Sequence, residues 1–435
     1  MKYYILSILL SLLFSVQMQG QERVLAFPGA EGFGRYAMGG RQGEVYHVTN
    51  LNDAGPGSLR EAVSQPNRIV VFDVSGVIRI ESRLAFSPNL TIAGQTAPGG
   101  GITVYGNAVS FSGADNTICQ YIRFRMGIQG DKGKDAAGIA FGNNMIFDHV
   151  SVSWGKDENF SISGSGQNPA DITIQNSIIA QGLHSHSCGG LIQTTGGVTL
   201  YRNLYIDNHT RNPKVKGLNQ FVNNVVYNWG GAGAYILGGS AATSWATIED
   251  NYFIKGPSSK SAAYTRANQN FQLFARGNYV DENRNGKLDG AESKKEDYGD
   301  AFWVESPTYW ETSTPSIPKM HPEIKGQSSA QDAYTWIKEK VGASFPARDA
   351  VDEYLIDELI SLGTKGAIIA NEAELGLPGG VGAVANTPKP QDSDNDGIPD
   401  EWEARLGTNP KANDAMTIGP DGYTNIERYI HRLTK

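Results

Sequence analysis

The chain of 435 residues carries a formal net charge of −8 at pH 7, and only 19% of its residues are charged. This acidic balance argues against a general role in binding nucleic acids or membrane surfaces. Cysteine occurs only at Cys119 and Cys188. Two buried thiols are favoured over a disulfide between them, so stability has to come from packing and from bound metals.

Residues 1–20 have the pattern of a secretory signal peptide. Lys2 supplies a positive charge, residues 5–16 form a short apolar run, and small or polar residues follow up to Gly20. The run is too short to span a membrane, and no later segment is long and apolar enough to do so. We therefore expect an exported protein that is secreted, periplasmic or at the cell surface, without a membrane span.

Residues 24–75 contain short β-like runs at 45–48 and 69–72, among glycine-rich turns. Between these runs, Ser58 and Glu61 have the spacing of a capping box, in which each side chain bonds the backbone N–H of the other residue. The sequence therefore predicts one short helix that starts at Ser58 and covers the open end of a stack of strands.

From about residue 78 to 280 the chain repeats a pattern in which apolar residues flank polar residues, often Asn. Seven segments fit, and they start at Cys119, Phe147, Ile174, Leu200, Phe221, Ile248 and Phe274. These starts recur at a nearly constant spacing, which together with strand-like chemistry indicates a solenoid, whereas a β-propeller needs about 40 residues per blade. We predict an all-β fold, a parallel β-helix over residues 21–300, with Asn amides stacked between the coils.

The segment 201–217 is a basic island in this acidic chain. It contains Arg202, Arg211, Lys214 and Lys216 against the single acid Asp207. A proline within it, at position 213, fixes its own φ and cannot donate to a sheet, so the segment should leave a strand as a stiff turn that presents its cations outward. A fixed cluster of Arg and Lys favours a carboxylate or a phosphate.

The repeat places the basic island relative to two other polar residues. Asp157, His184 and Arg211 are equally spaced along the chain, at the interval of the repeat. Equal spacing predicts that they share one face on successive coils, which puts Asp157 and Arg211 on the order of 10 Å apart. Such a gap would accommodate one sugar residue between an acid and a cation.

Two acidic stretches match the calcium loop of an EF-hand, with oxygen ligands at fixed spacing and a Gly at the sixth position. The first loop offers Asp281, Asn283, Asn285, Asp289 and Glu292, and the second offers Asp392, Asp394, Asp396, Asp400 and Glu403. Pro399 argues against a regular EF-hand pair. We therefore predict two structural calcium clips.

Residues 328–362 are the one stretch with helical periodicity. Apolar residues recur at helical spacing from Trp336 to Leu359, which indicates packing along the flank of the solenoid or over its C-terminal end. Residues 373–391 are rich in Gly, Ala and Pro and are typical of a linker. The chain would thus comprise the solenoid, a helical and irregular segment at 301–390, and a calcium-binding tail at 391–435.

The segment from Arg211 to Lys216, with Pro213 in its third position, resembles the R-x-P-x-x-R signature of polysaccharide lyase family 1, the pectate lyases. Lys216 stands where the last Arg usually is. Residues 147–149 are similar to the W-[IV]-D-H segment of that family, and Asp135 precedes them at the family's spacing. The helical part and the tail resemble a secreted bacterial branch. The resemblance implies a right-handed parallel β-helix and calcium-dependent cleavage of polygalacturonate, the backbone of pectin, by β-elimination.

The resemblance assigns roles to individual residues. Arg211 matches the catalytic base, Lys216 matches the residue that grips a substrate carboxylate, and Lys214 matches its basic neighbour. In place of a further substrate-binding Lys, the family pattern meets His184 and His186 here.

Asp135 and Asp157 match two ligands of the catalytic calcium. A further Asp is common in the family at the position of Ser161, so here either Glu158 or water completes the ligand set.

Several alternatives remain open at this level. The unperturbed pKa of Arg is about 12.5–13.8, so Arg211 could instead bind a carboxylate while His184 or His209 takes the proton. A pectin-acting inverting glycoside hydrolase would need two acids about 6.5–9.5 Å apart and no metal. A non-catalytic carbohydrate-binding solenoid would bind without turnover. We expect a monomer, and a de-esterified substrate rather than methyl-esterified pectin, which would not need calcium or so many cations.

Overall fold

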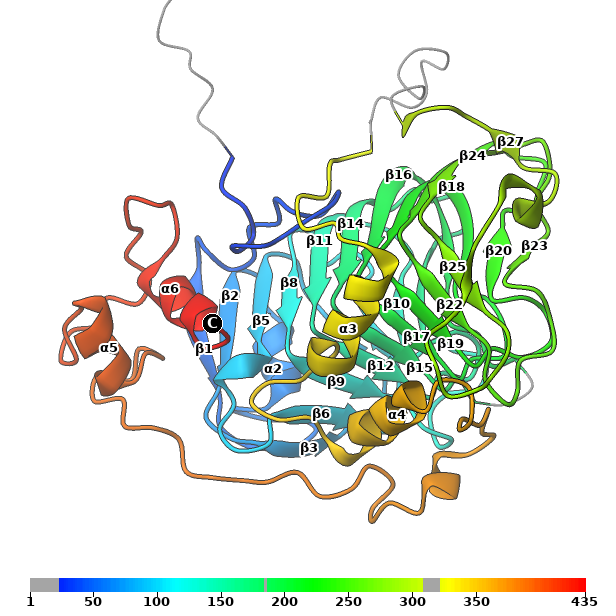
Figure 1. Cartoon of the computed structure of the whole chain (residues 1–435). Helices are drawn as coiled ribbons and strands as arrows, with labels where there is room; N and C mark the ends of the chain where they lie inside the picture. The colour runs from blue at the N-terminus through cyan, green and yellow to red at the C-terminus, as the bar shows by residue number, and fades with distance from the viewer. Residues whose placement is uncertain (1–22, 184–185, 308–320) are drawn as a thin grey trace, which may run out of the picture.

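The computed structural model describes residues 23–183, 186–307 and 321–435. Its strands form a 17-stranded and a 10-stranded sheet, which wind together into a solenoid of parallel coils (Figure 1). Each coil contributes short strands to three faces, which we name the ten-stranded, short-strand and long-strand faces. The predicted all-β parallel β-helix is confirmed.

The ten-stranded face contains β3 (Gly76–Arg79), β6 (Ile102–Tyr105), β9 (Ile122–Arg125), β12 (Ser151–Ser153), β15 (Ile178–Ala180), β17 (Leu204–Ile206), β19 (Val225–Tyr227), β22 (Tyr252–Ile254), β25 (Tyr279–Asp281) and the antiparallel β26 (Ala291–Glu292). The short-strand face contains β4 (Leu84–Ala85), β7 (Val109–Ser110), β10 (Ala137–Ile139), β13 (Phe160–Ser163), β20 (Tyr235–Leu237) and β23 (Tyr264–Thr265). The long-strand face contains β1 (Glu44–Val48), β2 (Arg68–Phe72), β5 (Leu90–Ala93), β8 (Ile118–Gln120), β11 (Asn143–Asp148), β14 (Ala170–Gln175), β21 (Ser244–Glu249), β24 (Phe271–Arg276) and β27 (Phe302–Trp303). Two long strands, β16 (Leu191–Tyr201) and β18 (Lys214–Val222), run from the short-strand face into the long-strand face.

The strand register tests the repeat directly. The first six segment starts lie opposite one another, from Cys119 against Phe147 through to Phe221 against Ile248. The seventh start was wrong by one position, because Ile248 lies opposite Ala275, and Phe274 is half-buried on the other side of β24. A slip of one position moves a side chain to the opposite face of a strand, so the larger apolar residue was mistaken for the inward one.

Buried asparagines tie successive coils together at the turns. The Oδ1 atoms of Asn203, Asn224, Asn251 and Asn278 each accept a backbone N–H from the coil before, over 2.7–3.0 Å. Their Nδ2 atoms donate to backbone carbonyls of the coils. These bonds satisfy turn backbone that has no strand partner, which is costly to bury otherwise. The predicted stacking of Asn amides is confirmed.

Aromatic rings fill the centre of the coils. Phe111 lies 4.1 Å from Phe86 in a stacked pair and 4.7 Å from Phe147 in an edge-on pair, and Phe147 lies 5.0 Å from Phe160. Such a column of rings adds to the apolar area that each coil buries against the next. Cys119 and Cys188 are free and buried, as the composition favoured.

The helices cover the outside of the solenoid. The predicted N-terminal helix is α2 (Leu59–Val63), and the Oγ of Ser58 caps it by accepting the backbone N–H of Glu61. Helices α3 (Ala330–Lys340) and α4 (Ala350–Ile360) lie against the ten-stranded face (Figure 1). Their apolar stripe packs on the flank rather than over the C-terminal end. Short 3₁₀ turns occur at Gly94–Thr96, Lys295–Tyr298 and Glu372–Leu375.

Buried charges fix α4 to the sheet. Arg125 of β9 donates from Nη2 to Asp349, over 2.7 Å, and to Asp352, over 2.9 Å. All three side chains are almost fully buried, so each charge depends on its partner.

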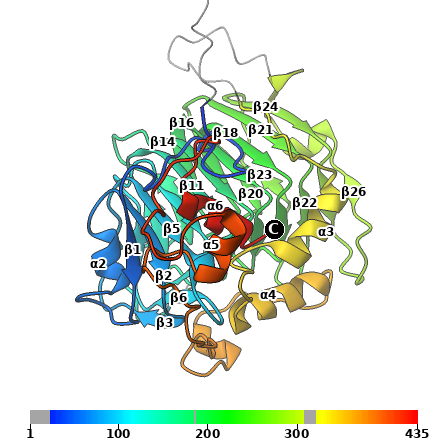
Figure 2. The ribbon, with the colours of Figure 1, turned by 90° about the vertical axis from the view of Figure 1, so that its left-hand side faces the viewer.

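The tail folds back onto the start of the long-strand face. Its helices are α5 (Asp400–Leu406) and α6 (Asn425–Arg432), which lie beside β1, β2 and β5 (Figure 2). Apolar side chains of the tail pack on Ile69 and Val71 of β2, and Arg41 forms a buried ion pair of 2.9 Å with Glu427. Within the described residues, no helix is long and apolar enough to cross a bilayer. The predicted signal peptide lies outside the described residues.

The structure predicts a pH-dependent contact between α4 and the solenoid. Burial and the nearby Glu358 raise the pKa of Asp207 well above its usual range. A raised folded-state pKa stabilises the fold below the unfolded value of about 3.9 and loses that contribution as the pH rises. Asp207→Asn keeps the acceptor for Asn228, at 2.6 Å, without the charge. We expect it to stabilise the protein by roughly 1–3 kcal/mol at pH 8 and by little near pH 4.

Denaturant unfolding at both pH values checks this expectation. The control is Asp131→Asn, which removes a carboxylate from an exposed loop and should change stability equally at the two pH values. A loss of stability in Asp207→Asn that is the same at pH 4 and pH 8 would contradict the assignment.

Candidate active site

The polar residues expected to act together lie in the connections that lead from the ten-stranded face into the short-strand face. Asp135 precedes β10, Asp157 and Glu158 precede β13, and Arg211 precedes β18. Because the coils are stacked in parallel, the same connection recurs in each coil, and residues far apart in sequence come side by side.

Three carboxylates gather at this corner. Asp135, Asp157 and Glu158 place one oxygen each within 4.8 Å of one another, and the backbone N–H of Glu158 donates to Asp135 over 3.1 Å. Burial, followed by the charges of Asp135 and Asp157, raises the pKa of Glu158 to about 8. Crowded oxygen ligands that repel one another fit a hard divalent cation such as Ca²⁺, whose charge would offset the repulsion.

Arg211 faces the same group. Its Nη1 forms an ion pair with Oε1 of Glu158. Burial lowers the pKa of the guanidinium, but the opposing effect of the neighbouring acidic groups, Glu158 and Asp157 among them, is larger, so the pKa lies above its ordinary value. Without a cation to offset their charge, the acids of the cluster therefore favour the charged form of Arg211, and a bound cation would weaken this effect.

The predicted equal phase of Asp157 and Arg211 was wrong. Backbone bridges align Glu158 with Cys188 and Cys188 with Thr210. The chain segment between the first two residues is therefore longer than the segment between the last two. The connection from β15 to Cys188 is longer than the one from β12 to Glu158, and the connection from β17 to Thr210 is shorter. Arg211 therefore does not stand a sugar's width from the acids, because it contacts Glu158 directly.

The histidines of this corner differ in position. His186 is exposed, and its Nε2 lies 3.0 Å from Asp157. His184 lies outside the described residues. The ring of His209 lies against Gly230, where an added Cβ would come within 2.2 Å of Nδ1. Ser161 is buried, its Oγ accepts the backbone N–H of Leu191 over 3.2 Å, and its hydroxyl also bonds Asp135. The third carboxylate of the cluster comes from Glu158.

The structure divides the basic island: Lys214 and Lys216 lie beside the cluster on the short-strand face, whereas Arg202 lies at another corner of the solenoid. Lys214 and Lys216, both half-buried, project from the same side of β18, opposite Leu191 and Gln193 of β16. Burial lowers the pKa of Lys214, and Lys216, Arg211 and Arg266 lower it further.

Arg266 was missed in the sequence. It follows β23, directly after Thr265, which lies in the same column of coils as Lys214. The spacing between Lys214 and Arg266 is twice the spacing between the segment starts Ile174 and Leu200, so the repeat would have placed Arg266 within one position of the column of Lys214.

The tail gathers a second set of acids. Asp392, Asp394 and Asp396 lie together, and Asp396, Glu403 and Asp414 lie together, with ligand atoms within 4.8 Å in each group. Both carboxylate oxygens of Asp394 and Oε2 of Glu403 are buried without a hydrogen-bond partner in the described part of the chain. Burial, then Asp394 and Asp396, raise the pKa of Glu403 to about 7. Buried, unpartnered carboxylates at this spacing fit a Ca²⁺ ion.

One expected ligand of the tail is used differently. Asp400 accepts the backbone N–H of Ser393 over 2.7 Å and its hydroxyl over 2.7 Å, and it is not in either group of acids. Asp414 takes part in its place. It follows Glu403, the last position of the predicted loop, and lies outside the span of an EF-hand motif, so loop spacing did not point to it.

The first predicted calcium loop is less well assembled. Asn283 and Asn285 donate from their amides to the two carboxylate oxygens of Asp289, over 2.7 and 3.0 Å. Asp281 accepts backbone N–H groups of the loop, and Glu292 belongs to β26. The acids of this loop do not form a close group of three among the described residues, and a calcium clip here stays a prediction.

Comparison with known proteins identifies the family. The chain is 55% identical over 415 residues to a "Probable pectate lyase C" of Neosartorya fischeri, a match that covers 95% of each chain. A protein of the same name from Aspergillus fumigatus is also 55% identical over 415 residues and 95% of each chain. The chain belongs to the pectate lyase family. "Probable pectate lyase 5" of Arabidopsis thaliana is 30% identical over 49% of this chain and 57% of its own.

Two further comparisons concern parts of the chain. The structure of the thermostable pectate lyase PL 47 superposes with a TM-score of 0.51 at 15% identity, covering 74% of this chain and 98% of that one, which supports the shared fold. A family model described as a bacterial TSP3 repeat matches residues 392–412. This match falls on the tail and includes Asp392, Asp394, Asp396, Asp400 and Glu403.

The acids of the tail predict that bound calcium stabilises this pectate lyase. Asp394→Asn should remove much of the increase in melting temperature that millimolar calcium gives, because binding at 100 times Kd is worth about 2.7 kcal/mol. Asp400→Asn should lower the melting temperature by a similar amount with and without calcium, since Asp400 bonds Ser393 instead. Calorimetry of both variants with calcium and with chelator measures the difference, and equal calcium responses would contradict this assignment.

Proposed function

We propose that this pectate lyase cleaves de-esterified polygalacturonate by calcium-assisted β-elimination, with Arg211 as the base, and releases 4,5-unsaturated oligogalacturonides. The observation that carries the proposal is the contact between a cluster of three carboxylates and Arg211, beside the basic side chains of Lys214 and Lys216. This set combines a place for a hard cation with several groups that bind carboxylates.

The chemistry needs both kinds of group. In a uronate chain the C5 proton lies next to the carboxylate, and the leaving oxygen is on C4. Neutral Arg211 takes the C5 proton, the C–H electrons form the C4–C5 double bond, the C4–O bond breaks, and the leaving oxygen takes up a proton from water. Negative charge builds up on the uronate carboxylate as the proton leaves, and Lys214 and Lys216 stabilise it through charge-assisted hydrogen bonds.

Calcium completes this arrangement. Asp135, Asp157 and Glu158 would hold the ion, since they are crowded oxygen ligands whose repulsion raises the pKa of Glu158. When bound, Ca²⁺ supplies a positive charge that acidifies the C5 proton by binding the uronate carboxylate. The chain and its substrate are both anionic, and this corner is where the chain offers positive charge to the substrate.

The competing functions fit the site less well. The acids lie within 4.8 Å of one another, closer than the roughly 6.5–9.5 Å that separates the two carboxyl groups of inverting glycosidases. His209, the alternative base among the described residues, packs against Gly230.

We also propose the biological setting inferred from the sequence. Residues 1–20 would direct export, and the mature protein would act as a monomer with a solenoid at 21–300, a helical segment at 301–390 and a tail at 391–435. Membership of a secreted bacterial branch of polysaccharide lyase family 1 is part of this proposal, and the relatives at 55% identity are fungal.

Arg211→Ala should lower kcat on polygalacturonate by about 10²–10⁴-fold, the usual contribution of a positioned base. Ultraviolet absorbance of the new C4–C5 double bond measures the rate, and chelator should abolish it in the parent protein. A hydrolase would give reducing ends without this absorbance, and a binding protein would give neither signal.

Two further variants separate the possible bases. His209→Gln should retain most of the activity if Arg211 is the base. If Arg211→Ala raises KM with kcat nearly intact while His209→Gln loses kcat, then Arg211 only binds a carboxylate and the assignment is wrong. Circular dichroism and the calcium-dependent melting temperature confirm that each variant is folded.

Lys216→Gln should raise KM for polygalacturonate by roughly 10-fold or more, since a hydrogen bond to a charged group contributes about 1.5–3 kcal/mol. On highly methyl-esterified pectin the variant and the parent should differ much less, because the ester removes the charge that Lys216 binds. Lys260→Gln, an exposed lysine outside the basic island, is the control and should leave KM unchanged. Equal losses on both substrates would contradict carboxylate recognition by Lys216.

A further inference from the structure

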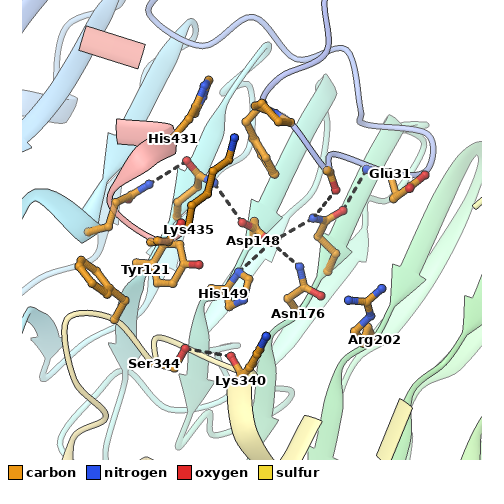
Figure 3. Close-up of a pocket in the computed structure, with 18 of the residues that line it drawn as sticks. Glu31, Tyr121, Asp148, His149, Asn176, Arg202, Lys340, Ser344, His431 and Lys435 are labelled. Atoms are coloured by element: carbon orange, nitrogen blue, oxygen red, sulfur yellow. Dashed lines mark hydrogen bonds and ion pairs between the residues drawn. The ribbon is translucent and has the colours of Figure 1, made fainter. Parts of the chain in front are cut away.

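A cavity of about 540 Å³ lies at another corner of the solenoid (Figure 3). Its floor consists of turn residues that follow the long strands, among them His149 after β11, Asn176 after β14 and Arg202 after β16. Its walls come from residues 27–31, from α3 and from the residues after α6. These turns lead into the ten-stranded face, whereas the carboxylate cluster lies in the connections that leave it. The cavity is therefore separate from the candidate active site.

One buried carboxylate orients the amides of the floor. Asp148, which is 3% exposed, accepts hydrogen bonds from Gln120 over 3.0 Å, from Gln175 over 3.0 Å and from Asn176 over 2.7 Å. Burial acts to raise its pKa, but the neighbouring His149 and the amide bonds lower it below the usual value. An ionised carboxylate only accepts, so each amide turns its N–H groups toward Asp148.

This orientation leaves two carbonyl oxygens without a partner. Gln95 donates to Gln120 over 3.1 Å, and its own Oε1 receives no bond from the described residues. The Oδ1 of Asn176 also receives no hydrogen bond from the described residues. Gln95 is 3% exposed and Asn176 is 7% exposed, and both line the cavity. Buried acceptors of this kind are satisfied by hydroxyl groups of a ligand.

Cations surround the same space. The guanidinium carbon of Arg202 lies 4.5 Å from the ring centroids of Tyr201 and Trp336, and its Nη2 donates to the backbone carbonyl of Gly326 over 3.0 Å. Lys340 and Lys435 also line the cavity, and within the described residues neither forms an ion pair. Figure 3 shows Lys435 and Lys340 on opposite sides of His149, and Arg202 next to Asn176.

The cavity is also lined by the carboxylates of Glu31 and Asp148, and Asp148 already accepts the amide bonds described above. Three cations against two acids leave an excess of positive charge, and Arg and Lys at such positions bind carboxylates.

Flat rings form part of the wall. Tyr121 and His149 are stacked with their centroids 4.5 Å apart and their planes inclined by 9°, and Trp336 lies nearby. Aromatic surface in a polar cavity suits a ligand that has both hydroxyl groups and an apolar C–H face, as a pyranose ring does. The volume lies within the roughly 300–1,000 Å³ of small-molecule sites.

We propose that this cavity is a second, non-catalytic saccharide site that binds a sugar acid, a pyranose with a carboxylate group. Gln95 and Asn176 accept its hydroxyl groups, and Arg202 and Lys340 bind its carboxylate. The site does not use the carboxylate cluster or Arg211, so the inference stands whether or not the chain cleaves polygalacturonate.

Binding of monosaccharides to the full chain tests the proposal. Galacturonic acid has no glycosidic bond to cleave, and galactose is the same ring without the carboxylate. Isothermal titration and ligand-observed NMR should show saturable binding of galacturonic acid at least about threefold tighter than that of galactose. Inorganic phosphate should compete weakly, because it lacks the ring.

Variants locate the site. Arg202→Gln should raise the Kd for galacturonic acid by about 10-fold, because the loss of one charge-assisted hydrogen bond changes Kd by about this factor. Lys340→Gln, at an exposed position of α3, should weaken binding severalfold without affecting the fold. Lys338→Gln on the same helix, outside the cavity, and Lys216→Gln, at the candidate active site, are matched controls and should leave binding unchanged.

The other outcomes overturn the proposal. They are equal binding of galactose and galacturonic acid, no saturable binding, phosphate binding as tight as that of the sugar acid, or equal effects of Lys340→Gln and Lys338→Gln. Loss of binding in Lys216→Gln with Lys340→Gln unaffected would assign the binding to the candidate active site instead.

Discussion

The parallel register between successive coils is the constraint on which the rest of this structure depends. Each strand has its hydrogen-bond partner one coil away, and the turns are held in step by Asn203, Asn224, Asn251 and Asn278, whose amides bond the backbone of adjacent coils. A single coil cannot bury its own apolar face, so stability accumulates only as coils stack. Once the register is set, each connection between two faces lies next to the same connection of the neighbouring coil, and the side chains of these connections form a column.

Two of these columns bring together groups that repel one another or lack partners. At one corner the acids around Glu158 face Arg211, and at another the amides around Asp148 leave carbonyl oxygens without donors among the described residues. Neither arrangement improves the stability of the ligand-free fold, because buried like charges and unbonded acceptors are costly. A bound cation or a polyhydroxylated ligand would offset this free-energy cost. The hydrogen bonds between the surrounding coils keep these groups in place.

Much of the fold could be predicted, because the solenoid repeats its pattern many times and one misjudged segment leaves the period intact. The error at Phe274 shifted one strand and nothing else. The site was predicted less well where it depends on the length of a single connection. The position of Arg211 depends on one long and one short connection between coils, and the average length of the repeat does not show either length. Asp414 joins the tail acids although it lies outside the loop motif.

The sequence by itself determined the coil, the basic residues, the carboxylates and the family, since each depends on local pattern or on short motifs. Only the tertiary structure decided which acid meets Arg211, that Asp400 bonds Ser393 instead of joining the metal-binding group, and that the tail closes a cavity against the long-strand face. The physical reason is that these contacts join side chains from separate coils or from the two ends of the chain. Their positions follow from how connections of unequal length pack together, and local sequence does not contain that information.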